Sequence, residues 1–188
     1  HDVSIIFKLP VLDFTEKMED VLRLIDERYV MISRIPQLQL VKSFQRIFAD
    51  YSVNIWNVPT LKLLKNFGVT SFVASPEIST TRVIDIAKKA GVSVMFIAQG
   101  KIPLGFSRGC FKELDLCDKM CKVQTFKLDN ISRGYQIEIA CNNDFGYRTI
   151  FSDDICITRV SSEFEQIIDV SSLQSESIVN LYGVEDVN

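Results

Sequence analysis

Short runs of apolar and β-branched residues recur along the chain, and most of them are separated by segments with helical periodicity. Runs of this kind predict strands that are buried on both faces. Their alternation with helices at this spacing is typical of parallel βα units, so the predicted class is α/β. The predicted strands cover residues 3–8, 29–33, 46–50, 69–73, 93–98 and 166–170.

Helix start and stop signals lie between these runs. A side-chain oxygen at the N-cap accepts from the free backbone N–H groups, and a glycine after the last turn permits the left-handed conformation that ends a helix. The predicted helices are 15–26, opened by Thr15; 58–67, opened by Asn57 and ended by Gly68; and 80–90, opened by Ser79 and ended by Gly91.

Between residues 122 and 151 the pattern changes to alternating polar and apolar residues, with a turn signal near 130–134. Such alternation predicts an antiparallel insertion over 122–151 within a single domain over 1–188. A short helix at 153–160 and a terminal helix at 173–182 are predicted after it. The six predicted parallel strands suit an open doubly wound sheet or part of a (β/α)8 barrel, and the pattern leaves both open.

Composition narrows the class of protein. The 188 residues are 47% hydrophobic and 24% charged, as in a globular domain. The formal net charge of −3 comes from mixed acids and bases, so general affinity for nucleic-acid phosphates is not expected. No apolar run approaches the roughly 18 residues of a membrane span, and the N-terminus lacks a signal-peptide pattern. We therefore predict a cytoplasmic protein without a transmembrane segment.

The single histidine is His1, at the position where a tag remnant would stand, so the chain offers no internal imidazole. A Ser-His-Asp triad, a Cys-His dyad and a histidine-based zinc or iron site are thereby excluded within this chain. Cys110 as a lone nucleophile is disfavoured for the same reason, because a general base for its thiol is missing.

Three of the five cysteines, Cys110, Cys117 and Cys121, lie within twelve positions. An odd count with this crowding favours reduced thiols or metal ligation over paired disulfides. On a helix Cys117 and Cys121 share one side, so the three thiolates are expected to converge on one ion or cluster. Iron-sulfur clusters and closed zinc sites both need a fourth ligand, for which the chain offers Cys141 or Cys156. Cys141 lies at the end of an alternating strand, so a structural role is favoured for it. Burial of the thiols as small hydrophobic side chains is the alternative.

Polar residues follow several predicted strands, and loops at the carboxyl ends of parallel strands usually carry the functional groups. Each has an ordinary structural interpretation: an N-cap for Asn57, and solvated loop acids for Asp50 and Glu77. Trp56, the only tryptophan, is suited to stacking on a ring substrate but is more often a core residue. The candidate substrate contacts are Asn54, Asn57, Glu77, Gln99 and Arg108.

Three stretches occur in the order NIWNVPTLKLLKNFGVTSFVASPEIS, VMFIAQGKIPLGFSRGC and CDKMC. Together they resemble the peptidase U32 family, and most closely its ubiquinone-biosynthesis branch, the UbiU and UbiV type, with UbiV nearest. The shared features are an asparagine-rich strand end, a strand ending in S-P-E, a G-x-x-P-L-x-x-S-x-x-C segment and a C-x-x-x-C. The similarity runs from about residue 3 to the last predicted helix.

The resemblance implies a TIM-type (β/α)8 barrel, of which this chain looks like the last six βα units, so that 1–188 would be a partial barrel domain. It also implies a 4Fe-4S cluster held by Cys110, Cys117 and Cys121, with the fourth family ligand upstream and Cys156 as its candidate substitute. Members of this branch support oxygen-independent hydroxylation of a ubiquinone precursor, UbiU and UbiV acting as a heterodimer. A sister subunit as partner and a small aromatic quinone precursor as substrate are therefore expected.

Other members of the family hydroxylate RNA or are known as collagenase-like proteases. A U32-type peptidase and a non-catalytic partner subunit are therefore the alternative functions. The chain departs from the family where a strand commonly reads E-V-F-V-H-G, because Met95 and Gln99 stand at the glutamate and histidine positions. The segment between Cys110 and Cys117 is also short. The missing histidine counts against a protease that needs it.

Overall fold

A computed structural model describes most of the first hundred residues and a set of strands after them. The described residues are 5–12, 15–24, 29–108, 123–129, 134–142, 147–152, 156–157 and 164–168. The chain divides into two compact units, one made of His1–Phe96 and Val160–Gln166, the other of Ile97–Arg159 and Ile167–Asn188.

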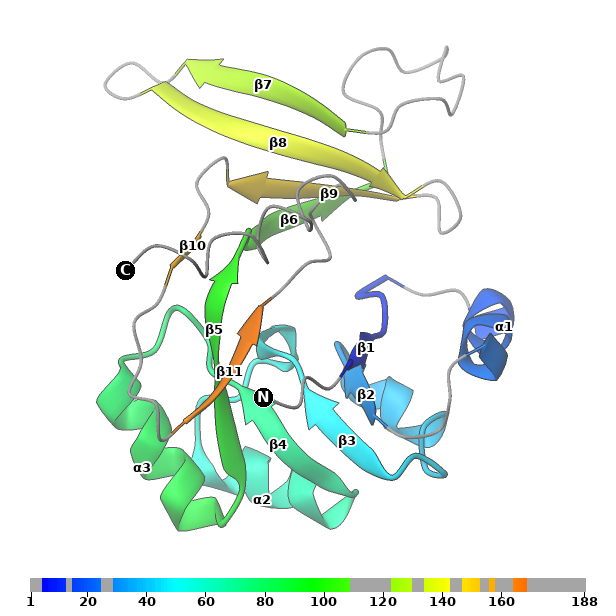
Figure 1. Ribbon diagram of the computed structural model, residues 1–188, viewed down its shortest axis with the longest axis vertical. Coiled ribbons are helices and arrows are strands. Elements are labelled where there is room, and N and C mark those ends of the chain that lie inside the picture. Colours follow the sequence, from blue (N-terminus) through cyan, green and yellow to red (C-terminus); the bar gives the residue numbers. More distant parts are fainter. Residues whose placement is uncertain are drawn as a thin grey trace, which may run out of the picture. The chain divides into compact units, whose positions relative to one another are not determined.

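The first unit is built on a parallel sheet whose strands follow chain order (Figure 1). Each strand pairs in parallel with the strand before it. Helices alternate with these strands, so the predicted α/β class is confirmed. The strands are β1 (Phe7–Lys8), β2 (Tyr29–Ile32), β3 (Arg46–Ala49), β4 (Val69–Val73) and β5 (Ser93–Gly100), the last of which continues into the second unit.

Helices α2 and α3 begin after the predicted N-cap residues Asn57 and Ser79, although the side chain of Ser79 makes no capping hydrogen bond. Asn57 is the N-cap of α2, and its side-chain oxygen accepts from the backbone N–H of Thr60 at 2.9 Å. Gly68 and Gly91 follow α2 and α3 with φ of 96° and 63°, the left-handed conformation that glycine adopts without a steric penalty. The helices are α1 (Thr15–Leu24), α2 (Val58–Asn66) and α3 (Thr80–Ala90), with the short 3-10 helices η1 (Ile35–Gln39) and η2 (Tyr51–Val53).

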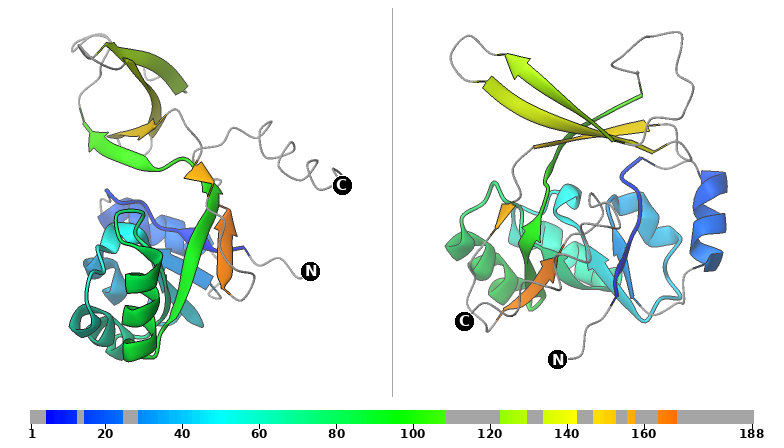
Figure 2. Two further views of the ribbon diagram at one scale, coloured as in Figure 1. Left: turned by 90° about the vertical axis from the view of Figure 1, so that its left-hand side faces the viewer. Right: turned by 45° about the horizontal axis from the view of Figure 1, so that its top comes forward.

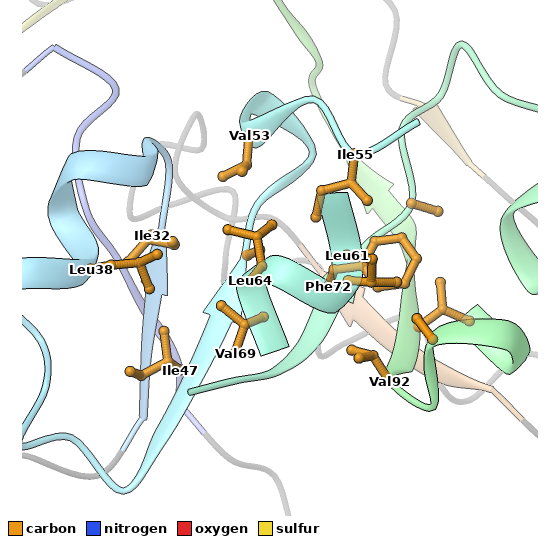
Figure 3. Packing of buried hydrophobic residues seen from close by; sticks show 14 of the residues in the cluster. Ile32, Leu38, Ile47, Val53, Ile55, Leu61, Leu64, Val69, Phe72 and Val92 are labelled. Atoms are coloured by element: carbon orange, nitrogen blue, oxygen red, sulfur yellow. The ribbon is translucent and has the colours of Figure 1, made fainter. Parts of the chain in front are cut away.

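One face of the sheet carries the main hydrophobic core. All three α-helices contribute to it, and α2 and α3 lie on the same side of the sheet in Figure 2. Leu61 and Leu64 of α2 pack beside Val69 and Phe72 of β4 (Figure 3). Alternate residues of each strand therefore point to the helices, as the pleat of a strand requires.

The opposite face of the sheet is also buried. Its apolar side chains alternate along the strands with those of the main core and belong to none of the helices. Phe48 lies on this face. The Arg46 guanidinium lies 5.0 Å from the centre of the Phe48 ring, and the Tyr29 ring packs edge-on against it with the ring centres 6.2 Å apart. The buried apolar residues of this face are Met31, Phe48, Val73, Met95 and Ile97.

The second unit contains an antiparallel sheet in the order β6-β9-β8-β7. Three of its strands confirm the antiparallel pairing predicted over 122–151. The fourth, β6, was not predicted, because its sequence PLGFS has little β propensity and is held as a strand by its pairing with β9. The strands are β6 (Pro103–Ser107), β7 (Val123–Asp129), β8 (Gly134–Asn142) and β9 (Tyr147–Ser152).

The prediction of a short helix at 153–160 is wrong in its described part. Residues 156–157 form strand β10 (Cys156–Ile157), which pairs antiparallel with the end of β5. Pairing with β5 satisfies backbone groups that a helix would have satisfied locally. The predicted strand at 166–170 is present as β11 (Glu165–Ile168), which also pairs with β5. The predicted helix at 173–182 lies outside the described residues.

None of the helices in the described ranges has both the length and the apolar character needed to cross a bilayer.

Candidate functional site

Buried polar side chains gather at the carboxyl ends of the parallel strands. Among the described residues the buried polar or charged side chains are Ser33, Gln37, Asp50, Ser71 and Ser75. Ser33, Asp50 and Ser75 directly follow or closely follow β2, β3 and β4, and Gln37 lies in η1 after β2. Parallel sheets bind their ligands at this edge, so it is the candidate site. We call Lys8, Ser33, Gln37, Asp50 and Ser52 the carboxyl-edge network.

Asp50 is the charged centre of this network. The prediction of a solvated loop acid is wrong, because its side chain is only 2% exposed. Its Oδ1 lies 3.2 Å from Nζ of Lys8, at the end of β1, and its Oδ2 accepts from the Ser52 hydroxyl at 2.6 Å. The Lys8 ammonium also lies 5.1 Å from the centre of the Tyr51 ring. A buried carboxylate is tolerated here because a cation and a hydroxyl compensate for its lost hydration.

Ser33 and Gln37 join the ends of β1 and β2. The side-chain oxygen of Gln37 accepts from the backbone N–H of Ser33 at 2.8 Å and from that of Arg34 at 3.1 Å. Its amide nitrogen donates to the carbonyl of Pro10 at 2.7 Å, and the Ser33 hydroxyl donates to the carbonyl of Leu9 at 2.7 Å. These bonds hold the loops after the first two strands in one arrangement, as a binding site requires.

Asn54 and Trp56 lie in the loop between β3 and α2. Asn54 caps the end of η2 in a left-handed conformation, with φ of 65° and ψ of 55°. Its side-chain oxygen accepts from the indole N–H of Trp56. The tendency of tryptophan to be a core residue does not hold here, because Trp56 is 39% exposed. Hydrogen bonding to Asn54 thus fixes the ring at the surface.

The other candidate contacts are divided between the two units. Glu77 lies in the loop after β4 and is exposed, in agreement with the solvated acid that its position predicts. Its backbone N–H lies 3.3 Å from the hydroxyl oxygen of Ser75. Gln99, near the end of β5, and the exposed Arg108, after β6, belong to the second unit. Within the first unit, Asn54, Asn57 and Glu77 all follow the carboxyl ends of parallel strands.

Asn57 has the structural role that its position predicts, because its side-chain oxygen caps α2. We expect Asn57→Ala to lower the free energy of unfolding by about 1 kcal/mol, and Asn57→Asp to retain most of it, since aspartate is an equally good N-cap. Urea denaturation followed by circular dichroism measures both values. Asn66→Ala, in the last turn of the same helix, is the matched control and should change stability by less than about 0.5 kcal/mol. Equal effects of the two alanine variants would contradict the capping role.

The predicted metal ligands Cys110, Cys117 and Cys121 lie outside the described residues, so their convergence stays a prediction. Cys156 is placed in β10, where its backbone is opposite Gly100 at the end of β5, while Cys141 lies in β8. In the described part of the chain, no group of three histidine, cysteine, aspartate or glutamate side chains is arranged to hold a metal ion.

Comparison with protein-family models, with curated proteins and with solved structures finds no match in any of the three.

Sequence reasoning did not single out Lys8, Ser33, Gln37 or Ser52. A weak signal exists for two of them: Lys8 is a charge at the end of the apolar run SIIFK, and Ser33 directly follows YVMI. A polar residue that ends a buried strand lies at the edge where parallel strands place their sites. Gln37 and Ser52 carry no such signal, because each also bonds to a carbonyl in another loop: Gln37 to that of Pro10, and Ser52 to that of Ser33.

Proposed function

We propose that this chain is an iron-sulfur protein of the U32 peptidase-like type that supports oxygen-independent hydroxylation, with its substrate at the carboxyl edge of the parallel sheet. The observation that carries the placement of the substrate is the carboxyl-edge network, in which the buried Asp50 is bonded to the partly exposed Lys8 and Ser52. The reaction and the cluster rest on the resemblance of the cysteine segment and the strand ends to that family.

The strand order supports a TIM-type barrel over a doubly wound sheet. In a doubly wound sheet the order reverses at a switch point and helices cover both faces. Here five strands follow chain order, and the helices of the described part contribute to one core on one face. The opposite face would then line the barrel. The Ser71 hydroxyl is buried on this face and has no hydrogen-bond partner in the described part. In a complete eight-unit barrel, the two further βα units would be able to provide that partner.

The donor set of the cysteine segment fits an iron-sulfur cluster by its chemistry, because thiolates are the usual ligands of such clusters. Cys110, Cys117 and Cys121 would hold the cluster, and Cys156 is the candidate fourth ligand. Its backbone in β10 pairs with Gly100 at the end of β5, and β6 follows β5 before the cysteine segment begins. When bound, a 4Fe-4S cluster supplies one-electron redox chemistry. Zinc is the alternative occupant, since a closed thiolate site also suits it.

The remaining parts of the proposal concern substrate and partner. Asn54, Asn57, Glu77, Gln99 and Arg108 are the proposed contacts of a small aromatic substrate, and a sister subunit of the same family is the proposed partner. Asn57 would contribute through its amide nitrogen, because its oxygen is used in the helix cap. The exposure of Asn54 and Glu77 on loops after parallel strands supports their assignment.

Purification without oxygen, followed by iron and acid-labile sulfide analysis, tests the cluster. We expect about four iron atoms and four sulfides per chain. Cys110→Ser, Cys117→Ser and Cys121→Ser should each remove most of the iron, because serine replaces a thiolate ligand, and Cys156→Ser should do the same if it is the fourth ligand. Cys141→Ser is the matched control and should keep the full iron content. Colourless protein with one zinc ion per chain would reject the proposal.

A further inference from the structure

Trp56 is the only tryptophan of the chain, and it is held at the surface rather than in the core. The residue is 39% exposed, although burial of a large aromatic side chain is strongly favourable. Its indole N–H donates to the side-chain oxygen of Asn54, so the ring is also restrained. A ring that is both exposed and restrained contributes little to the core and is suited to contact with a ligand.

The backbone that holds this ring is unusual. In the described ranges Asn54 is the non-glycine residue with a positive φ, and its N–H donates to the carbonyl of Tyr51 at 3.0 Å. Glycine would adopt this conformation at lower cost, but it would provide no side chain for the indole. Strained conformations of this kind are concentrated at functional sites.

The loop around Trp56 is held by contacts on both sides. The side chains of Val53 and Ile55 point into the main core (Figure 3). Their burial holds the backbone of Asn54 between them and that of Trp56 next to Ile55. Before them, Asp50 is bound by Lys8 and Ser52. After them, Asn57 caps α2 through Thr60. The ring of Trp56 is therefore presented on a fixed loop at the carboxyl edge of the sheet, where a ligand of this fold binds.

We propose that Trp56, held by Asn54, is the stacking surface for a planar aromatic ring of the ligand. A planar ring offers a π face that packs against the indole over its whole area, whereas a saturated ring of the same size does not. Trp56 would then be the residue that recognises the aromatic substrate of the proposed function. The identity of the ligand rests on that function. Ring binding itself requires no cluster.

The single tryptophan makes the test direct, because all indole fluorescence of the protein reports on this position. The full chain is titrated with benzoate, benzamide and nicotinamide, and with cyclohexanecarboxylate and cyclohexanecarboxamide as saturated counterparts. We expect saturable quenching by the planar rings and binding about ten-fold weaker for the saturated ones, the loss that one stacking contact produces. Similar affinities of benzoate and benzamide would assign the recognition to the ring rather than to the charge.

Two variants separate stacking from a structural role. Asn54→Gly keeps the left-handed backbone and the fluorophore but removes the acceptor, so the fluorescence anisotropy should fall and the planar rings should bind several-fold more weakly. Trp56→Leu, titrated by calorimetry, should lose about ten-fold in affinity. Leu63→Ala, an exposed apolar position on α2, is the matched control and should bind as the unaltered protein does.

Absence of saturable quenching by every planar ring would overturn the inference, and so would equal binding of planar and saturated rings. The titration is made on protein with and without iron. The proposed cluster and the proposed ring stacking are therefore tested independently. Ring binding in a protein that never takes up iron keeps this inference and rejects the cluster. A loaded cluster without ring binding does the reverse.

Discussion

Asp50→Ala is expected to lower the free energy of unfolding by about 2 kcal/mol, because it removes a buried carboxylate together with its ion pair to Lys8 and its hydrogen bond from Ser52. The carboxylate is 2% exposed, while the Lys8 side chain is 21% exposed and its ammonium also lies 5.1 Å from the centre of the Tyr51 ring. The substitution also removes the N-cap of η2 and one of two acceptors for the Ser52 hydroxyl, the other being the carbonyl of Ser33 at 3.0 Å. Urea denaturation followed by far-ultraviolet circular dichroism measures the change.

The matched control for this prediction is an ion pair at the surface. Asp85 and Lys89 lie 2.8 Å apart on α3, and the Asp85 side chain is 55% exposed. Asp85→Ala should cost less than about 0.5 kcal/mol, since exposed pairs are compensated by water. A double-mutant cycle of Asp50→Ala with Lys8→Met should show that the two losses are not additive. Equal costs for Asp50→Ala and Asp85→Ala would contradict the buried network and the site built on it.

Phe72→Ala is expected to lower the free energy of unfolding by about 4 kcal/mol, because it removes a large ring from the centre of the main core and leaves a cavity. Phe72 is 1% exposed, lies in β4 between two paired strands, and packs against Leu61 of α2 (Figure 3). Phe72→Leu, which fills most of the same volume, should cost about 1.5 kcal/mol or less. Both values follow from urea denaturation curves.

A second phenylalanine provides the control. Phe67, at the end of α2, is 58% exposed, so Phe67→Ala removes few packing contacts and should change stability by about 0.5 kcal/mol or less. A cost for Phe72→Ala no larger than that for Phe67→Ala would mean that Phe72 is not packed in the main core between β4 and α2.

The elements of the first unit could be read from the sequence because their signals are local. The apolar runs at 69–73 and 93–98 became β4 and most of β5, and Asn57, Gly68 and Gly91 took their predicted positions at helix ends. Such residues act on backbone groups within four positions, so no distant partner is needed.

The elements that were missed depend on distant partners. PLGFS became a strand through β9, and Cys156 and Ile157 became a strand through the end of β5. Neither segment has the propensity that would identify it, because pairing in a sheet outweighs weak local preference. The same dependence explains why the convergence of Cys110, Cys117 and Cys121 follows from spacing and resemblance alone and stays a prediction.

The predicted site and the described network overlap only in part. Loops after β3 and β4 were expected to carry the site residues, whereas the carboxyl-edge network lies at the ends of β1, β2 and β3, so the two share only the loop after β3. The burial of Asp50 was not expected, because it depends on Lys8, which reaches it from β1 across the end of β2. The exposure of Trp56 was not expected either, because it depends on the left-handed turn at Asn54 and on the core contacts of Ile55.

Alternating apolar runs and helix caps determined the α/β class, the order of the elements and most of their ends, since these follow from interactions within one turn or one strand. The tertiary structure decided which polar side chains are buried together at the carboxyl edge and which aromatic ring is left in solvent. Both properties depend on contacts between residues that are far apart in the chain and that exclude water from one another. The sequence pattern does not show which distant residues are in contact, because this is decided by the pairing of the strands.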